Sequence, residues 1–268
     1  MLRLSALYRY PLKSGKVDVL RSVDLDKLGL DGDRRWMLVD EASGRFLTQR
    51  AEAKMSQLSA LWNAQGGLTL SAPQQPPIEI ALPGNDAELR GVTIWRDTLR
   101  VPDAGDEAAR WVSDFIGKPT RLVQVPLDRA RTTQAGYGND DDQVAFADGF
   151  PLLLIGESSL QDLSQKVGRP LEMLRFRPNL VIEGSEAYAE DGWKRIRIGD
   201  VEFRVVKPCS RCILTTIDPQ TGERSADREP LATLQKYRAE ADGAMFGQNL
   251  VNDNNGRLEV GMPVEILE

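Results

Sequence analysis

Short runs of alternating apolar and polar residues, separated by turn residues, constrain the fold of this chain most. Such alternation occurs in residues 194–198 and again in residues 201–206, with Gly199 and Asp200 between the two runs. Successive side chains of a strand point to opposite faces of a sheet, so this pattern predicts a β-hairpin around a Gly-Asp turn. Similar runs recur at a spacing of about 8 to 12 residues, which favours barrels or sandwiches. The sequence therefore predicts a mainly β protein with some helices, of the α+β class.

Residues 1–125 have the pattern of a β-rich domain. One helix is expected at residues 106–116, because its apolar residues share one face and Gly117 follows. A short helix is expected at residues 54–61 and a loop at residues 72–77. Strands are expected at residues 2–10, 36–39, 45–48, 78–82 and 92–95, the second and third forming a hairpin around residues 41–44.

Residues 126–268 are expected to form a second domain. One helix should begin with a capping box at Ser158 and end at Gly168, and another should run from Pro230 to about residue 239. Residues 128–148 are long, polar and rich in Asp, so they form either a functional loop or a solvated linker. Strands are expected at residues 151–155, 180–182 and 213–217, with two more before the C-terminus.

The composition excludes several classes of function. The 268 residues carry a net charge of −6, which argues against nucleic-acid or anionic-membrane binding. Histidine is absent, which removes Ser-His-Asp and Cys-His catalysis and His-bound zinc. Two cysteines cannot build a four-cysteine zinc site or an all-cysteine iron–sulfur cluster. Neither a signal peptide nor an apolar run long enough for a membrane span is found, so we expect a cytoplasmic protein.

The two cysteines lie in the segment Cys209-Ser-Arg-Cys212, for which three interpretations compete. They can be ordinary small residues in a turn between two strands. They can form a dithiol redox pair, although such pairs precede a helix and residues 213–217 have the β-branched pattern of a strand. Alternatively, one thiolate is a ligand to a soft or redox-active metal, with basic neighbours such as Arg211 and a cofactor that supplies the other ligands.

Three further segments carry chemistry. One short motif contains Arg175, Arg177 and Asn179. The guanidinium groups suit phosphate binding and the amide suits hydrogen bonding to the edge of a heterocycle. The alternative interpretation is a pair of surface arginines. Lys13 and Ser14, with Arg34 or Arg35, lie just past expected strand ends and could together form an oxyanion cradle, though each alone is more often a solvated loop residue.

Asp218 begins the tight turn Asp218-Pro-Gln-Thr-Gly222, for which a structural role is sufficient. A proton source near the metal is a second role for this carboxyl, if a low-dielectric site raises its pKa.

These motifs resemble the molybdenum-cofactor sulfurase C-terminal (MOSC) domain family. The resemblance lies in Phe176-Arg-Pro-Asn179, in residues 188–193 and 198–201, and in residues 209–222. Residues 10–14 and 33–36 resemble the N-terminal β-barrel domain that precedes MOSC in the mitochondrial amidoxime-reducing components and their bacterial relatives. The resemblance implies a MOSC N-terminal β-barrel domain at residues 1–125 and a MOSC domain at residues 126–268.

The resemblance also implies a molybdenum–molybdopterin cofactor between the two domains, with Cys212 completing the sulfur ligation of the metal. The implied reaction reduces N-hydroxylated compounds, namely hydroxylamines, amidoximes and hydroxylaminopurines. Cys212 and Asp218 are the candidate catalytic residues. The residues that match the cofactor-holding positions are Lys13, Ser14, Arg34, Arg177, Asn179, Ser210, Arg211 and, with a weaker match, Phe246.

Electrons are expected from a separate protein, either a ferredoxin, a flavoprotein or a cytochrome. Many bacterial relatives carry a ferredoxin domain and the mitochondrial proteins carry a membrane anchor, and neither is found in residues 1–268. Two alternatives of other classes stay open at this point. The protein could carry molybdenum cofactor or sulfur on Cys212, or it could be a plain dithiol oxidoreductase.

Overall fold

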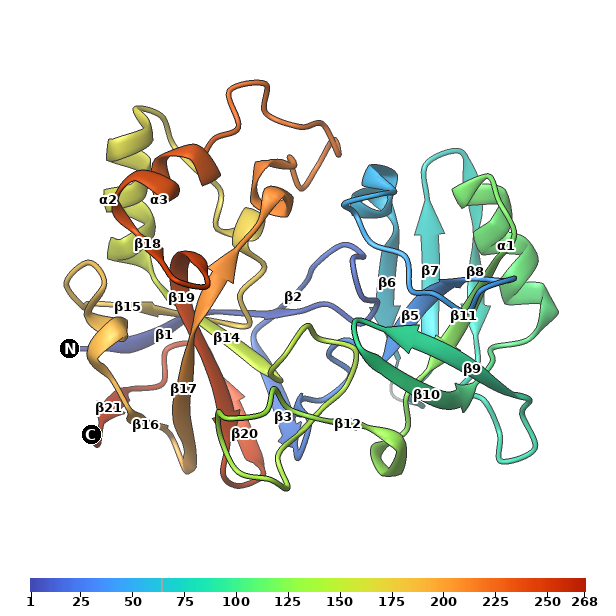
Figure 1. Cartoon of the computed structure of the whole chain (residues 1–268). Helices are drawn as coiled ribbons and strands as arrows, with labels where there is room; N and C mark the ends of the chain where they lie inside the picture. The colour runs from blue at the N-terminus through green and yellow to red at the C-terminus, as the bar shows by residue number, and fades with distance from the viewer. Residues whose placement is uncertain (64) are drawn as a thin grey trace.

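The computed structural model describes residues 1–63 and 65–268. Figure 1 shows two lobes side by side, one holding the large sheet with helices α2 and α3, the other holding smaller sheets with helix α1. Over the described residues the protein is mainly β with three α-helices, which confirms the predicted α+β class. No helix in this part of the chain is both long and apolar enough to cross a membrane.

A nine-stranded sheet forms the larger lobe, and its strands come from both ends of the chain. The order is β2-β1-β15-β14-β19-β17-β16-β21, with β18 also paired to β19. β14 runs parallel to β15, and every other neighbouring pair is antiparallel. The bounds are β1 Arg3–Arg9, β2 Asp18–Leu20, β14 Leu152–Gly156, β15 Leu180–Glu183, β16 Arg195–Ile198, β17 Val201–Arg211, β18 Ala239–Glu240, β19 Gly243–Asn252 and β21 Val264–Ile266.

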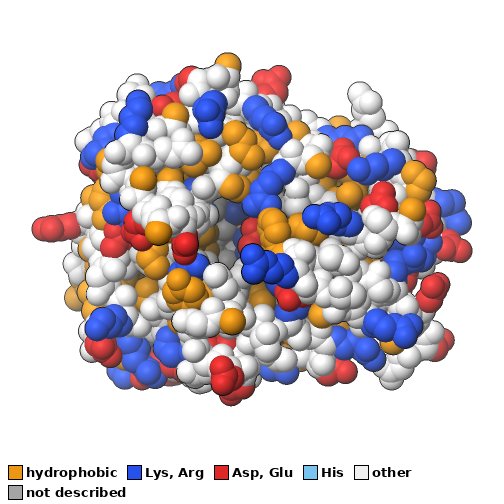
Figure 2. All heavy atoms as spheres, in the orientation of Figure 1, with side chains coloured by type: hydrophobic (Ala, Val, Ile, Leu, Met, Phe, Trp, Pro, Cys, Tyr) orange, Lys and Arg blue, Asp and Glu red, His pale blue; other side chains and the backbone are white. Residues whose placement is uncertain are grey.

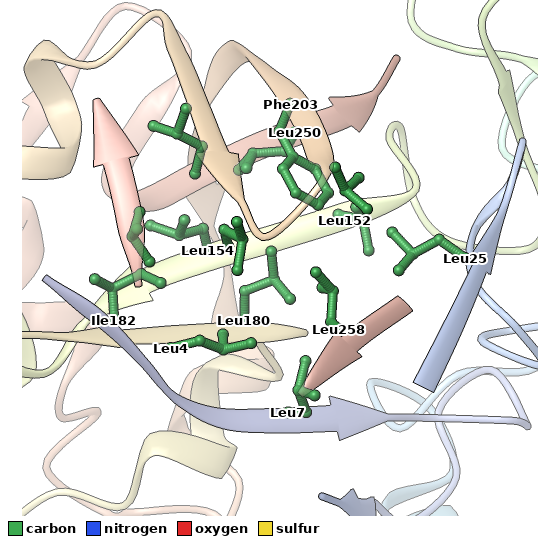
Figure 3. Close-up of a cluster of buried hydrophobic side chains, with 14 of the residues drawn as sticks. Leu4, Leu7, Leu25, Leu152, Leu154, Leu180, Ile182, Phe203, Leu250 and Leu258 are labelled. Carbon is green, nitrogen blue, oxygen red and sulfur yellow. The ribbon is translucent and has the colours of Figure 1, made fainter. Parts of the chain in front are cut away.

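The N-terminal residues belong to this lobe in space. β1 pairs with β15, and β3 (Ser22–Asp26) pairs with both β4 (Gly29–Leu30) and β20 (Gly256–Glu259). Sheet hydrogen bonds therefore cross the boundary that the sequence predicts at residue 125. Figure 3 shows the apolar core between these sheets, which includes Leu4, Leu7, Leu25, Leu180, Leu250 and Leu258.

The smaller lobe is built from short sheets around two apolar clusters. Helix α1 (Asp106–Ile116) has its apolar face against the core that contains Trp36, and Gly117 ends it in the left-handed conformation, as expected. The strands are β5 Trp36–Asp40 with β11 Thr120–Gln124, β6 Ser59–Trp62 with β7 Leu68–Ala72 and β8 Gln75–Ile80, β9 Leu89–Ile94 with β10 Asp97–Pro102, and β12 Arg131–Thr132 with β13 Gln143–Val144.

Several local predictions for the first half are wrong. The helix expected at 54–61 is a 3-10 helix, η1 (Ala53–Gln57), followed at once by β6, because burial alternates from residue 58 onward. The loop expected at 72–77 ends early: β8 already begins at Gln75, and its two prolines fit because this strand is an edge of its sheet. The returning strand at 45–48 is reduced to isolated bridges at Arg45 and Phe46.

The second half follows its predicted pattern more closely. Helices α2 (Glu157–Val167) and α3 (Leu231–Tyr237) lie where they were expected, and the hairpin around Gly199 is formed by β16 and β17. The capping box at Ser158 is wrong, since Gly156 is the N-cap and no side chain of the helix caps it. Residues 128–148 are not structureless, because β12 and β13 pair within them.

A basic pocket around Cys212

A pocket of about 340 Å³ lies between segments from the two halves of the chain. Figure 2 shows a hollow in the middle of this face with Lys and Arg side chains beside it. The volume is within the range of sites for small molecules and cofactors, about 300–1,000 Å³. Thr48, Arg50 and Trp95 line it from the first half, and Cys212 and Thr215 from the second.

The pocket wall is strongly basic in a chain that is acidic overall. Only one acidic residue, Asp148, is among its described lining residues. The basic lining residues are Lys13, Arg34, Arg50, Arg175, Arg177, Lys207 and Arg211. Since low-dielectric walls strengthen the field of such a cluster, the pocket is suited to an anionic ligand.

Cys212 lies where β17 gives way to the 3-10 helix η5 (Ile213–Thr216), of which it is the N-cap. The strand predicted at 213–217 is therefore wrong. Cys209-Ser-Arg continues β17, so these residues do not form the turn that one of the three interpretations placed there. The β-branched residues adopt the helical turn because the hydroxyls of Thr215 and Thr216 donate to carbonyls three residues earlier, at 3.0 and 2.7 Å.

The two cysteines differ in their surroundings, and both are free thiols. The Nε and Nη2 groups of Arg50 donate to the sulfur of Cys212, at 3.4 and 3.2 Å. Cys209 packs against an apolar cluster that contains Phe176, and burial raises the pKa of its thiol. The residues after Cys212 form a 3-10 helix of four residues, so the longer helix typical of a dithiol redox pair does not follow it.

Lys13 is buried at the pocket wall. Its ammonium donates to the carbonyl oxygen of Phe146 at 2.8 Å and forms an ion pair with Asp148. Burial lowers the pKa of Lys13 to about 8, although Asp148 acts in the opposite direction. The neighbouring Ser14, also in the wall, has a φ of 63°, in the left-handed region.

Arg34 and Arg177 both lie against the ring of Tyr10, with their guanidinium carbons 4.5 and 4.1 Å from its centroid. Both arginines have positive φ angles, 48° and 54°, which is uncommon for residues other than glycine. Asp33 forms an ion pair with Arg34 and accepts the N–H of Tyr10, so it fixes this turn. Burial lowers the pKa of Arg177 to about 10.

Asn179 joins the two halves beneath these arginines. Its side-chain oxygen accepts from Arg34 at 3.1 Å and from the N–H of Leu153 at 3.2 Å, and its amide donates to the carbonyl of Tyr8 at 3.1 Å. It is 1% exposed, so in this arrangement it orients the pocket wall.

The remaining predicted cofactor residues divide into two groups. Ser210 and Arg211 line the pocket; the hydroxyl of Ser210 donates to the carbonyl of Asp242, and Arg211 lies 5.3 Å from the ring centroid of Phe176. Phe246 does not line the pocket. Its ring is fully buried behind Phe176, with the two ring centroids 4.5 Å apart, so it supports the wall from the core.

Asp218 does not have the raised pKa that a proton source would need. Burial acts to raise its pKa, but N–H groups of Thr221 and Gln220 and the charge of Arg175 lower it overall. Its carboxylate pairs with Arg175 at 2.9 Å and does not line the pocket. The structural interpretation of this turn is therefore sufficient.

Several pocket residues were not identified from the sequence as site residues. Arg50 and Trp95 lie in turns of the first half. Asp148 is the last residue of the long polar segment 128–148, and its position at the pocket favours the interpretation of this segment as a functional loop. The side chain of Asp148 is 61% exposed, and the charges of Lys13 and Arg50 lower its pKa well below the usual range. In the sequence, these three residues are distinguished only by a charge or an aromatic ring near a turn, which is too common to indicate a site.

The wall has unused donors that fit an anionic cofactor. Arg175, Arg177 and Arg211 each have one buried N–H nitrogen without a hydrogen-bond partner. Buried polar groups are normally paired, so a bound ligand with acceptor atoms would supply the missing partners. Among the described residues no group of three or more Cys, Asp or Glu could hold a metal, so a metal at Cys212 would need ligands from a cofactor.

Comparisons with known proteins agree with this arrangement. A family model described as the MOSC N-terminal beta barrel domain matches residues 1–119, and the MOSC domain model matches residues 141–265. Mitochondrial amidoxime-reducing component 1 of Homo sapiens is 34% identical over 282 residues, covering 98% of this chain and 82% of the relative. Mitochondrial amidoxime reducing component 2 of Rattus norvegicus is 35% identical, covering 97% and 82%.

Component 1 of Danio rerio is 32% identical, covering 97% of this chain and 83% of the relative. These matches extend over nearly the whole of residues 1–268 and include both halves of the pocket. The chain therefore belongs to the MOSC family, with a MOSC N-terminal beta barrel domain followed by a MOSC domain, and is related to the mitochondrial amidoxime-reducing components.

Proposed function

We propose that this protein is a molybdenum-cofactor-dependent reductase of N-hydroxylated compounds. The observation that carries the proposal is the pocket itself: a free cysteine, Cys212, faces a cavity whose charged lining residues are all basic except Asp148. The phosphate of such a cofactor would pair with the basic side chains, and its thiophilic metal would be ligated by the cysteine sulfur. The names of the similar proteins, which describe amidoxime-reducing components, support the same reaction class.

The residues of this chain would divide the binding of that cofactor between them. Lys13, Ser14 and Arg34 from the first half, with Arg177 and Arg211 from the second, would bind its acidic and polar atoms, while Cys212 would ligate the metal. Ser210 lies at the same wall, and Asn179 would hold Arg34 in place. When bound, a molybdenum cofactor supplies a two-electron couple at an oxygen-accepting metal.

In the overall reaction, an N–OH group takes up two electrons and two protons and becomes an N–H group and water. Lys13 is the candidate for moving protons at this site, because it lines the pocket and has a pKa of about 8, close to neutral pH. Asp218 is withdrawn from this role. We propose that the electrons come from a separate ferredoxin, flavoprotein or cytochrome, and that the protein is cytoplasmic.

Metal analysis with two cysteine variants tests the proposal. The wild-type protein and the Cys212→Ser and Cys209→Ser variants are produced in a host that makes the cofactor. We expect about one molybdenum per chain in the wild type and in Cys209→Ser, and almost none in Cys212→Ser. Reduction of benzamidoxime, with reduced methyl viologen as the electron donor, should follow the metal content.

Each alternative gives a different result. Wild-type protein without molybdenum under these conditions would contradict the proposal. Loss of activity in both cysteine variants, with no metal in any of them, would favour a dithiol oxidoreductase. Bound molybdenum without turnover of amidoximes or hydroxylamines would favour a carrier of cofactor or sulfur on Cys212.

A further inference from the structure

Arg50 reaches from the first half of the chain to the sulfur of Cys212 in the second half. Its Nε and Nη2 groups, on one edge of the guanidinium, both donate to this sulfur, at 3.4 and 3.2 Å. Its Nη2 is also 3.8 Å from the carboxylate of Asp148. The backbone of Arg50 is fixed as well, because its carbonyl accepts from the guanidinium of Arg224 in the second half.

Trp95 also contacts the guanidinium of Arg50. The guanidinium carbon of Arg50 lies 4.9 Å from the centroid of the Trp95 ring, and that ring packs edge-on against Phe46, with centroids 4.9 Å apart. A planar guanidinium held against an aromatic ring has fewer orientations available, which favours keeping its N–H edge directed at the sulfur.

The backbone at Trp95 is strained, which is unexpected for a bulky residue. Trp95 and Arg96 form the two-residue turn between β9 and β10, and the φ angle of Trp95 is +54°. Turns of this kind favour Gly, Asn or Asp where φ is positive. Such strain persists where the surrounding structure fixes the residue, and it is common at functional sites. Trp95 is 40% exposed, so burial in the core does not explain its presence.

We propose that Arg50 is a positioning residue for Cys212: it holds the sulfur through two hydrogen bonds and, with Trp95 behind it, tunes the metal that this sulfur ligates. The part that concerns the metal rests on the proposed function. Hydrogen bonds to a ligating sulfur withdraw electron density from it, and such outer contacts set the reduction potential of a metal site. The first half of the chain thereby contributes to the metal site without supplying a ligand.

The test compares Arg50→Lys, Arg50→Met and Trp95→Leu with the wild type, as molybdenum-loaded proteins. Arg96→Met is the matched control, because Arg96 is exposed in the same turn as Trp95 and does not line the pocket. We expect the molybdenum reduction potential and the Mo(V) electron paramagnetic resonance spectrum, measured per bound molybdenum, to change in all three test variants. The potential should fall, and kcat for benzamidoxime should fall about 10- to 100-fold for Arg50→Met.

Arg50→Lys separates positioning from charge alone. Lysine keeps the positive charge but lacks the planar edge with two N–H groups, so it should behave like Arg50→Met rather than like the wild type. Rescue by lysine would contradict the proposal, and so would an unchanged potential and spectrum in Arg50→Met. If Arg50→Met folds, as judged by circular dichroism, but retains no molybdenum while Arg96→Met does, the holding role is supported and Trp95→Leu provides the potential measurement.

The failure of this inference is distinguishable from failure of the proposed function. Wild-type protein without molybdenum or turnover would contradict the proposed function. Wild-type protein with both, alongside Arg50 variants with a wild-type potential and spectrum, would contradict only the role of Arg50.

Discussion

At the scale of one residue, the buried ammonium of Lys13 lowers the stability of the fold but provides a positive charge for ligand binding. Its ammonium is buried beside Asp148, with Arg34 and Arg131 also near, and burial lowers its pKa to about 8 from an ordinary value of 10.5. A lysine whose folded pKa is lowered favours unfolding while it is charged. The loss of folding stability caused by this charge is therefore largest below pH 8, and it decreases as the pH rises from 8 toward 10.5.

Relative to the wild type, Lys13→Met should be more stable at pH 7 than at pH 10, by about 1–3 kcal/mol, because only the wild type carries the buried charge whose cost depends on pH. The difference should narrow between pH 8 and pH 10, and binding of inorganic pyrophosphate to the metal-free protein should weaken at pH 7. Urea unfolding at several pH values and calorimetric titration measure the two effects. Lys118→Met is the control, since that lysine is partly exposed in an ion pair with Glu52. A stability difference that does not depend on pH would contradict the prediction.

The sequence indicated most of the basic residues of the pocket but not their contacts. Lys13, Arg34, Arg177 and Cys212 were identifiable because each lies in a motif. Arg50 could not be distinguished from the other arginines of the chain, because its role depends on a turn that meets Cys212 from the other half. Phe246 lies in a matching motif but in the layer behind the wall, since a motif does not specify which face of a strand is buried.

At the scale of elements, tertiary contacts override local preference. Residues 213–217 are β-branched in pattern, yet η5 forms because threonine hydroxyls bond back to the preceding turn. The start of α2 is a second case: Glu190, from the distant 3-10 helix η4 (Ala189–Gly192), accepts from the N–H of Gly156 at 3.0 Å and from the hydroxyl of Ser159 at 2.7 Å. Sequence patterns near Ser158 could not reveal a cap supplied from more than 30 residues away.

Glu190→Ala should lower the free energy of unfolding by about 1–3 kcal/mol, because it leaves the buried N–H of Gly156 and hydroxyl of Ser159 without their acceptor. Glu190→Gln keeps an acceptor and should be close to the wild type at pH 7. Burial raises the pKa of Glu190, so its charged form opposes folding. The wild type should gain stability relative to Glu190→Gln as the pH falls through the raised pKa toward 4.5.

Urea unfolding at pH 4.5 and pH 7 measures both effects of Glu190. The exposed Glu186 provides the control as Glu186→Gln, for which no pH-dependent difference is expected. Equal stability of Glu190→Ala and the wild type would show that this carboxylate does not act as the cap.

At the scale of the whole molecule, the pocket exists only because the two halves share a sheet and a wall. The first strands complete the large sheet: the N–H of Leu4 donates to the carbonyl of Met262, and the N–H of Val264 donates to the carbonyl of Leu2. The two chain ends consequently lie side by side, as Figure 1 shows. The alternation of apolar residues predicted these strands, but not that they cross to the other half, because pairing partners are not encoded in a local pattern.

This arrangement predicts how the C-terminal half behaves alone. Residues 126–268 without the first strands lose the five buried side chains that this segment contributes to the core, namely Leu4, Leu7, Val23, Leu25 and Leu30. At about 1.5–3 kcal/mol each, the loss of about 7–15 kcal/mol is as large as the whole stability of a typical domain. We expect this fragment to lack a cooperative thermal transition in calorimetry.

A rearranged chain is the matched test, with residues 1–31 joined after residue 268 by a short Gly-Ser linker. Because the termini are adjacent, these residues can pair with β15 and β20 as in the intact protein, and a cooperative transition should return. The same rearranged chain with Leu4 and Leu7 replaced by Ser should again lose the transition, since both side chains are fully buried. A cooperative transition in the isolated fragment, at the temperature of the rearranged chain, would show that the first strands are dispensable for the fold of the larger lobe.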